Sequence, residues 1–306
     1  MRRTTGLLSA LLLATLAASA EAQPRPPLRP APARPGVRPG VPAANGAANG
    51  PAARVIPLRE AVQMLQSANG DEVLTGLDAL VRLGTPDVIP PMVDLIHRGV
   101  DDSALENVVE KLGIIGRPEA IDELSSLLHH RRSTVREKAV TALSHIRDNR
   151  VRPLLESGLR DSDPTVRGAA ARALGEIGAR QSVELLQRAF ERNVPEAAES
   201  LGRLGTVAIA EHMLESVGRS PLGILLPGFR RFLDRRDIAD PAKLHIVEQL
   251  VARSPTSEVK RFLQSWVDSL PPTNRTPSRA RALLAIQQIN EDRAPAAPAA
   301  PAGGAQ

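Results

Sequence analysis

The sequence predicts an all-α protein in which pairs of helices stack side by side into an α-α solenoid, or superhelix. The main observation is a five-residue phrase with leucine first and leucine or isoleucine fourth, which begins at Leu80, Leu112, Leu143, Leu174 and Leu201. These starts are 32, 31, 31 and 27 residues apart. A period of this length on a helical pattern is typical of stacked helix pairs. The composition agrees, because 42% of the residues are hydrophobic but only 2% are aromatic, which predicts an aliphatic core.

The clearest unit runs from Asp161 to Glu191 and predicts two helices. Asp161-Ser-Asp163-Pro164 has the composition of a turn that caps a helix, with proline in the first turn. Apolar residues then recur on one helical face, at Val166, Ala170, Ala173, Leu174 and Ile177. Gly178 is expected to end this helix in the left-handed conformation. A second helix follows, marked by Val183, Leu186, Ala189 and Phe190.

The other units are expected to repeat this plan along the chain. An opening helix over 57–67 caps the stack, and the first helix of four pairs is expected to end at Gly84, Gly116, Gly178 and Gly205. Past Gly205 the period blurs, and Pro227 with its neighbouring glycines predicts a broken or offset helix over 221–236. Helices over 244–251, 259–267 and 278–289 close the array at about seven pairs.

The N-terminus predicts export. Arg2 and Arg3 precede an uncharged run over 6–20, and Ala20-Glu-Ala22 is a small-x-small site, so residues 1–22 are expected to form a signal peptide cleaved after Ala22. The alternative is a retained anchor, but the run is shorter than the roughly 20 residues that span a bilayer. We therefore expect no membrane span after cleavage, and a periplasmic or extracellular location, with a bacterial envelope favoured.

Two low-complexity segments flank the predicted solenoid of residues 55–291. Residues 23–54 are rich in Pro, Ala and Arg, with five arginines and no acid, and are expected to be a disordered linker. Residues 292–306 are expected to be a disordered Ala/Pro tail. The linker is interpreted as a spacer, with a basic tether for an anionic surface as the alternative. Because the rest of the mature chain is nearly neutral, we expect no nucleic-acid partner.

The motif at Asp161–Gly178, Asp-x-Asp-Pro-x-Val-Arg followed by Ala-x-Ala-Leu-Gly-x-Ile-Gly, resembles the short bacterial HEAT repeats of the phycobilin-lyase-type class. The likeness is good over 70–205 and loose over 206–290. It implies a right-handed superhelix whose inner face carries the second helices and binds protein. The unit at Leu143 departs from the motif, because Ser144 and Arg147 stand where glycines are usual, and we expect Asn149 to take the left-handed position there.

The same class of repeats includes tetrapyrrole lyases and a metal-dependent hydroxylase, but enzymatic chemistry is not predicted for this chain. The His-Glu pairs that would hold the irons of the hydroxylase are absent, and there is no cysteine. His212 and Glu215 share a helical face but are only two metal ligands. Ser257-x-x-Lys260 matches one motif of penicillin-recognising enzymes without the others. We expect no catalytic residue, no metal and no cofactor, with a lyase-like or other enzyme subunit as the alternative.

Two sets of arginines stand out. Arg136 and Arg167 recur with the repeat and are interpreted as structural partners of Asp161 and Asp163, rather than as anion ligands. The second set is a candidate protein-binding segment, since arginine beside aromatic rings is enriched at binding hot spots; it comprises Arg219, Phe229, Arg230, Arg231, Arg235 and Arg236. The sequence thus predicts an exported HEAT-repeat scaffold with protein partners.

Overall fold

A computed structural model describes residues 55–289. The predicted signal peptide, linker and C-terminal tail lie outside these residues. Within the described range every named element is helical, with fifteen α-helices and three short 3-10 turns. The all-α prediction is therefore confirmed for this part of the chain.

The helices form one opening element and seven consecutive pairs. α1 (Leu58–Met64) opens the array. The first helices of the pairs are α2 (Gly70–Leu83), α4 (Asp102–Ile115), α6 (Ser133–Ser144), α8 (Pro164–Glu176), α10 (Pro195–Leu204), α12 (Leu222–Asp234) and α14 (Ser257–Ser269). The second helices are α3 (Ile89–His97), α5 (Ile121–Leu127), α7 (Val151–Gly158), α9 (Val183–Glu191), α11 (Val207–Glu215), α13 (Asp240–Arg253) and α15 (Pro277–Gln288). The 3-10 turns Pro86–Val88, Pro118–Ala120 and Arg180–Ser182 lead into α3, α5 and α9.

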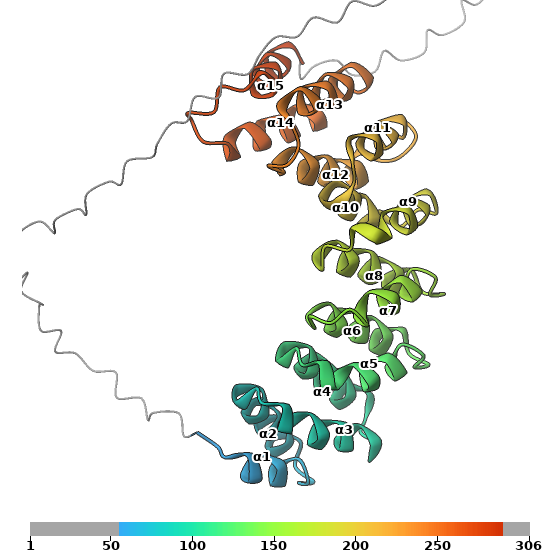
Figure 1. The fold of residues 1–306 in the computed structure, drawn as a ribbon, viewed down its shortest axis with the longest axis vertical. Coiled ribbons are helices and arrows are strands. Elements are labelled where there is room, and N and C mark those ends of the chain that lie inside the picture. The colour runs from blue at the N-terminus through green and yellow to red at the C-terminus, as the bar shows by residue number, and fades with distance from the viewer. Residues whose placement is uncertain (1–54, 290–306) are drawn as a thin grey trace, which may run out of the picture. The chain divides into compact units, whose positions relative to one another are not determined.

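The pairs place their helices in two layers. From α2 to α12 the first helices follow one edge of the array and the second helices follow the other (Figure 1). Consecutive first helices pack closely on one another, whereas α5, α7 and α9 make almost no contact among themselves. One aliphatic core runs between the layers, from Ala61 to Ile289. Neither layer can bury its apolar stripe alone, which is why the helices require their neighbours.

The unequal spacing of the two layers sets the direction of bending in this part of the array. Because the first helices lie closer together than the second helices, the pairs from α2 to α11 bend toward the first helices (Figure 1). The expectation that the second helices line the inner face is therefore wrong here. The order reverses at the end, where α13 and α15 pack more closely than α12 and α14.

Close approach of the first helices depends on small residues. The sharpest case is Gly202 of α10, where an added Cβ would lie 1.9 Å from the carbonyl oxygen of Gly228 in α12. In the preceding pair, a Cβ on Gly175 would lie 2.3 Å from the hydroxyl oxygen of Ser200. Real atoms cannot approach so closely, so glycine is required at Gly202 by the backbone of the next repeat and at Gly175 by the side chain of Ser200.

The predicted glycine caps hold at three of four positions. Gly84, Gly116 and Gly178 have φ values of 59°, 66° and 73°, as a left-handed cap requires. Gly205 has an extended backbone instead, with φ of −69° and ψ of 166°. A Cβ there would lie 2.6 Å from the carbonyl oxygen of Leu201, so this glycine is needed for space and not for handedness.

Two local expectations are corrected. Asn149 does not take the left-handed position, because α6 stops at Ser144 and the chain leaves through right-handed His145. Among the described non-glycine residues, Asn193 alone has a positive φ. The segment over 221–236 is not broken either: α12 is continuous although Pro227 lies within it. Pro227 is exposed, so the backbone carbonyl that it leaves without a donor can face water.

Arg136 joins two repeats through Asp161. The Nε and Nη2 atoms of Arg136 donate to the carboxylate of Asp161 at 2.8 and 2.7 Å, and both side chains are only 12% exposed. Arg167 donates to the carbonyl oxygens of Asp161 and Ser162 at 2.8 and 2.9 Å. Asp163 accepts from the backbone N–H of Thr165 and caps α8. These contacts place the turn before α8 between two repeats.

We expect Gly202→Ala to destabilise the array by about 3 kcal/mol, because the new methyl group meets the backbone of Gly228 and forces the helices apart. Gly223→Ala is the matched control, since nothing lies within 4 Å of its added Cβ. The control should be neutral or stabilising by up to about 1 kcal/mol. Urea unfolding followed by circular dichroism measures both, and equal stability of the two variants would contradict the packing role of Gly202.

We expect Asp161→Asn to lower the free energy of unfolding by about 2 kcal/mol at pH 7. The hydrogen bond from Arg136 lowers the pKa of Asp161 in the folded state. Its stabilisation is thus complete above the unfolded pKa, near pH 4, and is lost as the pH falls through the folded pKa.

The difference between wild type and Asp161→Asn should consequently be smaller at pH 3 than at pH 7, as measured by urea unfolding at each pH. Asp122→Asn is the control, because that side chain is 92% exposed, and it should change stability little at either pH. A cost for Asp161→Asn that is the same at both pH values would exclude the charged interaction as its source.

Candidate functional site

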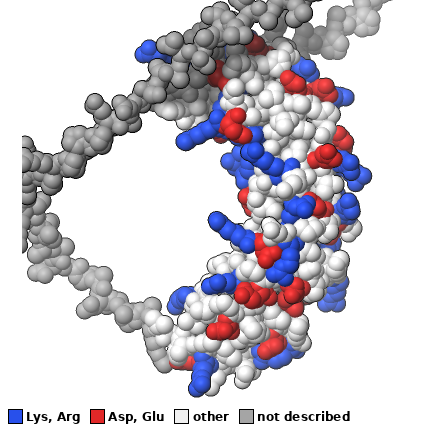
Figure 2. Space-filling model, in the orientation of Figure 1, with Lys and Arg blue, Asp and Glu red and all other residues white. Residues whose placement is uncertain are grey.

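The first-helix layer carries a ladder of ion pairs between consecutive helices. Each pair joins one first helix to the next across the exposed surface: Asp78 to Lys111 at 2.6 Å, Glu110 to Lys138 at 3.1 Å, Arg172 to Glu196 at 3.7 Å, and Glu199 to Arg231 at 2.7 Å. Figure 2 shows acidic and basic groups interspersed along the array. The layer therefore presents alternating charges and not a field of one sign.

The ladder is interrupted between α6 and α8. One period after Glu110 and Lys138 stand Thr141 and Ala169, neither of which has a charge. No ion pair joins these two helices directly within residues 55–289. The neighbouring ion pairs contribute one base to each of these helices. Lys138 of α6 pairs with α4, and Arg172 of α8 pairs with α10. Within the described residues, the first-helix layer thus lacks an ion pair between α6 and α8, although it has one on either side of them.

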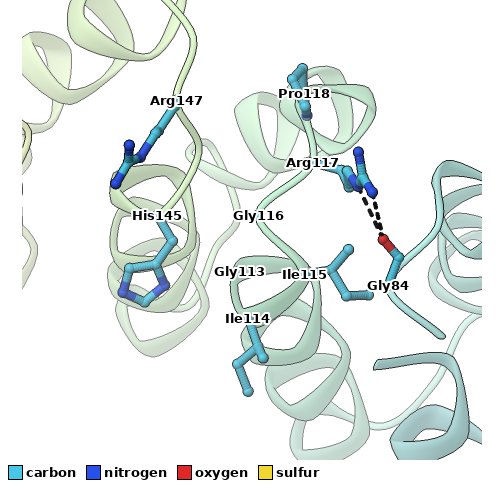
Figure 3. A pocket seen from close by; sticks show the side chains of 9 residues that line it. All are labelled: Gly84, Gly113, Ile114, Ile115, Gly116, Arg117, Pro118, His145 and Arg147. Atoms are coloured by element: carbon cyan, nitrogen blue, oxygen red, sulfur yellow. Dashed lines mark hydrogen bonds between the residues drawn. The ribbon is translucent and has the colours of Figure 1, made fainter. Parts of the chain in front are cut away.

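A cleft of about 540 Å³ lies beside this interruption, at the C-terminal ends of α4 and α6 (Figure 3). His145 and Arg147 form one wall, and Arg117 with Pro118 forms the other. Arg117 is held in place because its Nε and Nη2 atoms donate to the carbonyl oxygen of Gly84 at 3.1 and 2.9 Å. Among the residues that the structure describes, no carboxylate lines the cleft.

The aromatic rings of the predicted binding segment are not on the surface. Phe229 is completely buried and Phe232 is 1% exposed, since both fill the core beneath α12. Phe229 is therefore removed from the candidate contact residues. Arg235 lies 5.9 Å above the ring of Phe232, at the end of the helix. The pattern of arginine beside phenylalanine reflects one helix with a buried face and a polar face.

Most arginines of this segment are bonded within the chain. Arg230 pairs with Asp234 at 2.8 Å, Arg231 pairs with Glu199, and Arg219 donates to the carbonyl oxygen of Glu215 at 2.7 Å. Arg236 is exposed and forms no hydrogen bond or ion pair within the described residues. The segment contributes to the repeat contacts more than to an open basic patch.

Arg235 connects three repeats. It donates to the carbonyl oxygen of Gly205 in the preceding repeat and pairs with Asp237 at 2.8 Å. This hydrogen bond lowers the pKa of Asp237 to about 2. Asp237 also lies 3.4 Å from Arg180, which belongs to the repeat before that. The contact spans the α10 unit, whose phrase follows the preceding one after 27 residues instead of 31.

The other polar candidates have ordinary partners. His212 lies 3.3 Å from Glu215 and 3.4 Å from Glu191, but no group of metal-ligating residues that could hold an ion is found over residues 55–289. Ser257 begins α14, whose cap is the hydroxyl of Thr256.

Sequence reasoning did not find the ion-pair ladder or the cleft. The signal for the cleft was present, because Ser144 and Arg147 depart from the repeat motif at the point where it forms. The ladder has a signal too, since its partners lie 24 to 33 residues apart, close to the repeat period. Recognising it requires knowing which helical positions face the next repeat.

Comparison with known proteins places the chain in a family. A family model of HEAT repeats matches residues 58–144, 89–165, 121–202 and 156–224. The chain is similar to the solved complex of CpcE and CpcF of phycocyanin lyase from Nostoc sp. PCC7120, with 18% identity and a TM-score of 0.44, over 84% of this chain and 100% of that one. It is also similar to two engineered proteins, each at 17% identity over 76% of this chain and 98% of theirs, with TM-scores of 0.31 and 0.34. No curated protein matches it.

The matched repeats together cover more than half of the sequence, and their boundaries fall within the stack of helix pairs that the structure contains. The repeated phrase, the two helical layers and the family match agree, and the chain belongs to the HEAT-repeat family.

Proposed function

We propose that this protein is a scaffold that binds other proteins along its first-helix layer, in the envelope of a bacterium. The observation that supports this most is the extended surface of alternating charges between consecutive first helices. Such a surface suits a partner with complementary charges distributed along its length. HEAT repeats themselves suggest protein interaction.

The inward bend favours the first-helix layer over the second. A partner on the inner side of a curved array can contact several repeats at once, so that each repeat adds to the buried area. The backbone N–H and C=O groups of this layer are already hydrogen-bonded within the helices. Hydrophobic side chains fill the core between the two layers. Recognition would therefore depend on side chains at the surface, chiefly on charge and shape.

The proposed location rests on sequence features at residues 1–22, which lie outside the described residues. Arg2, Arg3, the uncharged run and Ala22 have the composition and order of a cleavable export signal. Within residues 55–289 no helix is both long and apolar enough to cross a membrane. Export and cleavage would release the mature chain on the outer side of the cytoplasmic membrane.

We expect charge reversal on the first-helix layer to weaken partner binding roughly ten-fold, because the like charges it creates at the interface repel the partner. The test variant is Arg172→Glu with Arg231→Glu. The control is Arg160→Glu with Arg188→Glu, which alters exposed arginines on the side of α7 and α9. In-cell crosslinking with mass spectrometry measures the yield of each partner. Equal loss in both variants, with intact helicity, would count against a specific role of the first-helix layer.

We expect residues 1–54 to direct a fused reporter out of the cytoplasm, with the mature chain beginning at Gln23 after cleavage. Leu12→Lys interrupts the uncharged run and should retain the reporter inside the cell, because a charge in this region opposes insertion. N-terminal sequencing and reporter activity measure the outcome. Retention of Met1, or export that survives Leu12→Lys, would overturn the signal-peptide assignment.

A further inference from the structure

The cleft between α4 and α6 has a composition that the rest of the first-helix layer lacks. Its floor is formed by glycine and isoleucine, and its walls carry Arg117, His145 and Arg147 (Figure 3). The cleft exists because the α6 unit departs from the repeat. His145 and Arg147 follow α6 at the place where the α2, α4 and α8 units turn at a left-handed glycine.

Of the two arginines that line the cleft, Arg147 is the one without a partner among the described residues. It is exposed and forms no hydrogen bond or ion pair with any described residue. Neighbouring arginines at the same edge are bonded: Arg117 to Gly84, and Arg150 to Asp148 at 3.2 Å. A guanidinium that faces a cleft without a carboxylate is available to a carboxylate from outside.

An apolar side chain lines the same cleft. Ile114 is 55% exposed at the mouth of the cleft, although it belongs to a helix whose other large apolar residues are mostly buried. Burial of Ile114 by a ligand would remove apolar surface from water beside the ion pair. The cleft thus offers one cationic and one apolar contact within the same hollow.

The surrounding charges exclude a long polyanion. Asp148 and Glu176 line the groove that continues from the cleft past His145 and Arg147. A phosphate backbone that followed this groove would meet both acids, whereas a single carboxylate in the cleft needs to reach only Arg147.

We propose that this cleft binds an acidic side chain of a partner protein, in a segment where Asp or Glu stands next to a large aliphatic or aromatic residue. The carboxylate pairs with Arg147 and the apolar neighbour covers Ile114. This inference rests on the proposed scaffold function and assigns the partner chemistry at one position of the layer.

The test is selection from a random heptapeptide display library on immobilised mature protein, residues 23–306. Selected sequences should share Asp or Glu beside a large apolar residue. The same selection on Arg147→Glu should lose the acids and favour Lys or Arg, while Arg188→Glu should select as wild type does. Fluorescence anisotropy of one selected peptide should show binding weakened roughly ten-fold by Arg147→Glu and by replacing its acid with the amide.

Several results would overturn the assignment. These are the absence of acidic sequences among the selected peptides, the same sequences selected by Arg147→Glu, or displacement of the peptide by a single-stranded oligonucleotide that itself binds through Arg147. Each of these results would overturn the assignment of the cleft and would leave the scaffold proposal unaffected. Loss of crosslinked partners on Arg172→Glu with Arg231→Glu would keep that proposal standing even if no acidic peptide were selected.

Discussion

Contact between the backbones of consecutive first helices is the constraint on which this array depends. At Gly202 the backbone of Gly228 leaves no room for a Cβ, and at Gly175 the side chain of Ser200 already fills the space between the helices. The second helices have no comparable contacts from α5 to α9. Because the helices of the first layer lie closer together than those of the second layer, the stack must bend. The direction of this bend decides which surface faces a partner.

Charged residues serve this packing in two ways. Arg136 and Arg235 reach from one repeat to acids or carbonyl oxygens of another and join turns that aliphatic side chains do not cover. The ladder on the first-helix layer pairs acids with bases across exposed surface, where each pair contributes little stability. Its consequence is an ordered pattern of charge for recognition, and Arg147 adds a guanidinium in the cleft that pairs with no described residue.

Prediction from sequence succeeded for local features and failed for those that depend on neighbouring repeats. Gly84, Gly116 and Gly178 are left-handed caps, as the end of each apolar stripe indicated. Gly205 is not, because the shortened α10 unit leaves its helix along an extended path. Phe229 looked like a surface residue from its arginine neighbours, yet the face of α12 that it occupies is buried by adjacent helices.

The sequence by itself determined that the chain is a stack of amphipathic helix pairs, since the period, the apolar faces and most helix ends are written within single repeats. Tertiary structure alone decided which layer bends inward, which arginines are bonded and where a cleft opens. Those properties depend on the rotation from each repeat to the next. That rotation is set jointly by contacts between residues about thirty positions apart, so no single repeat contains it.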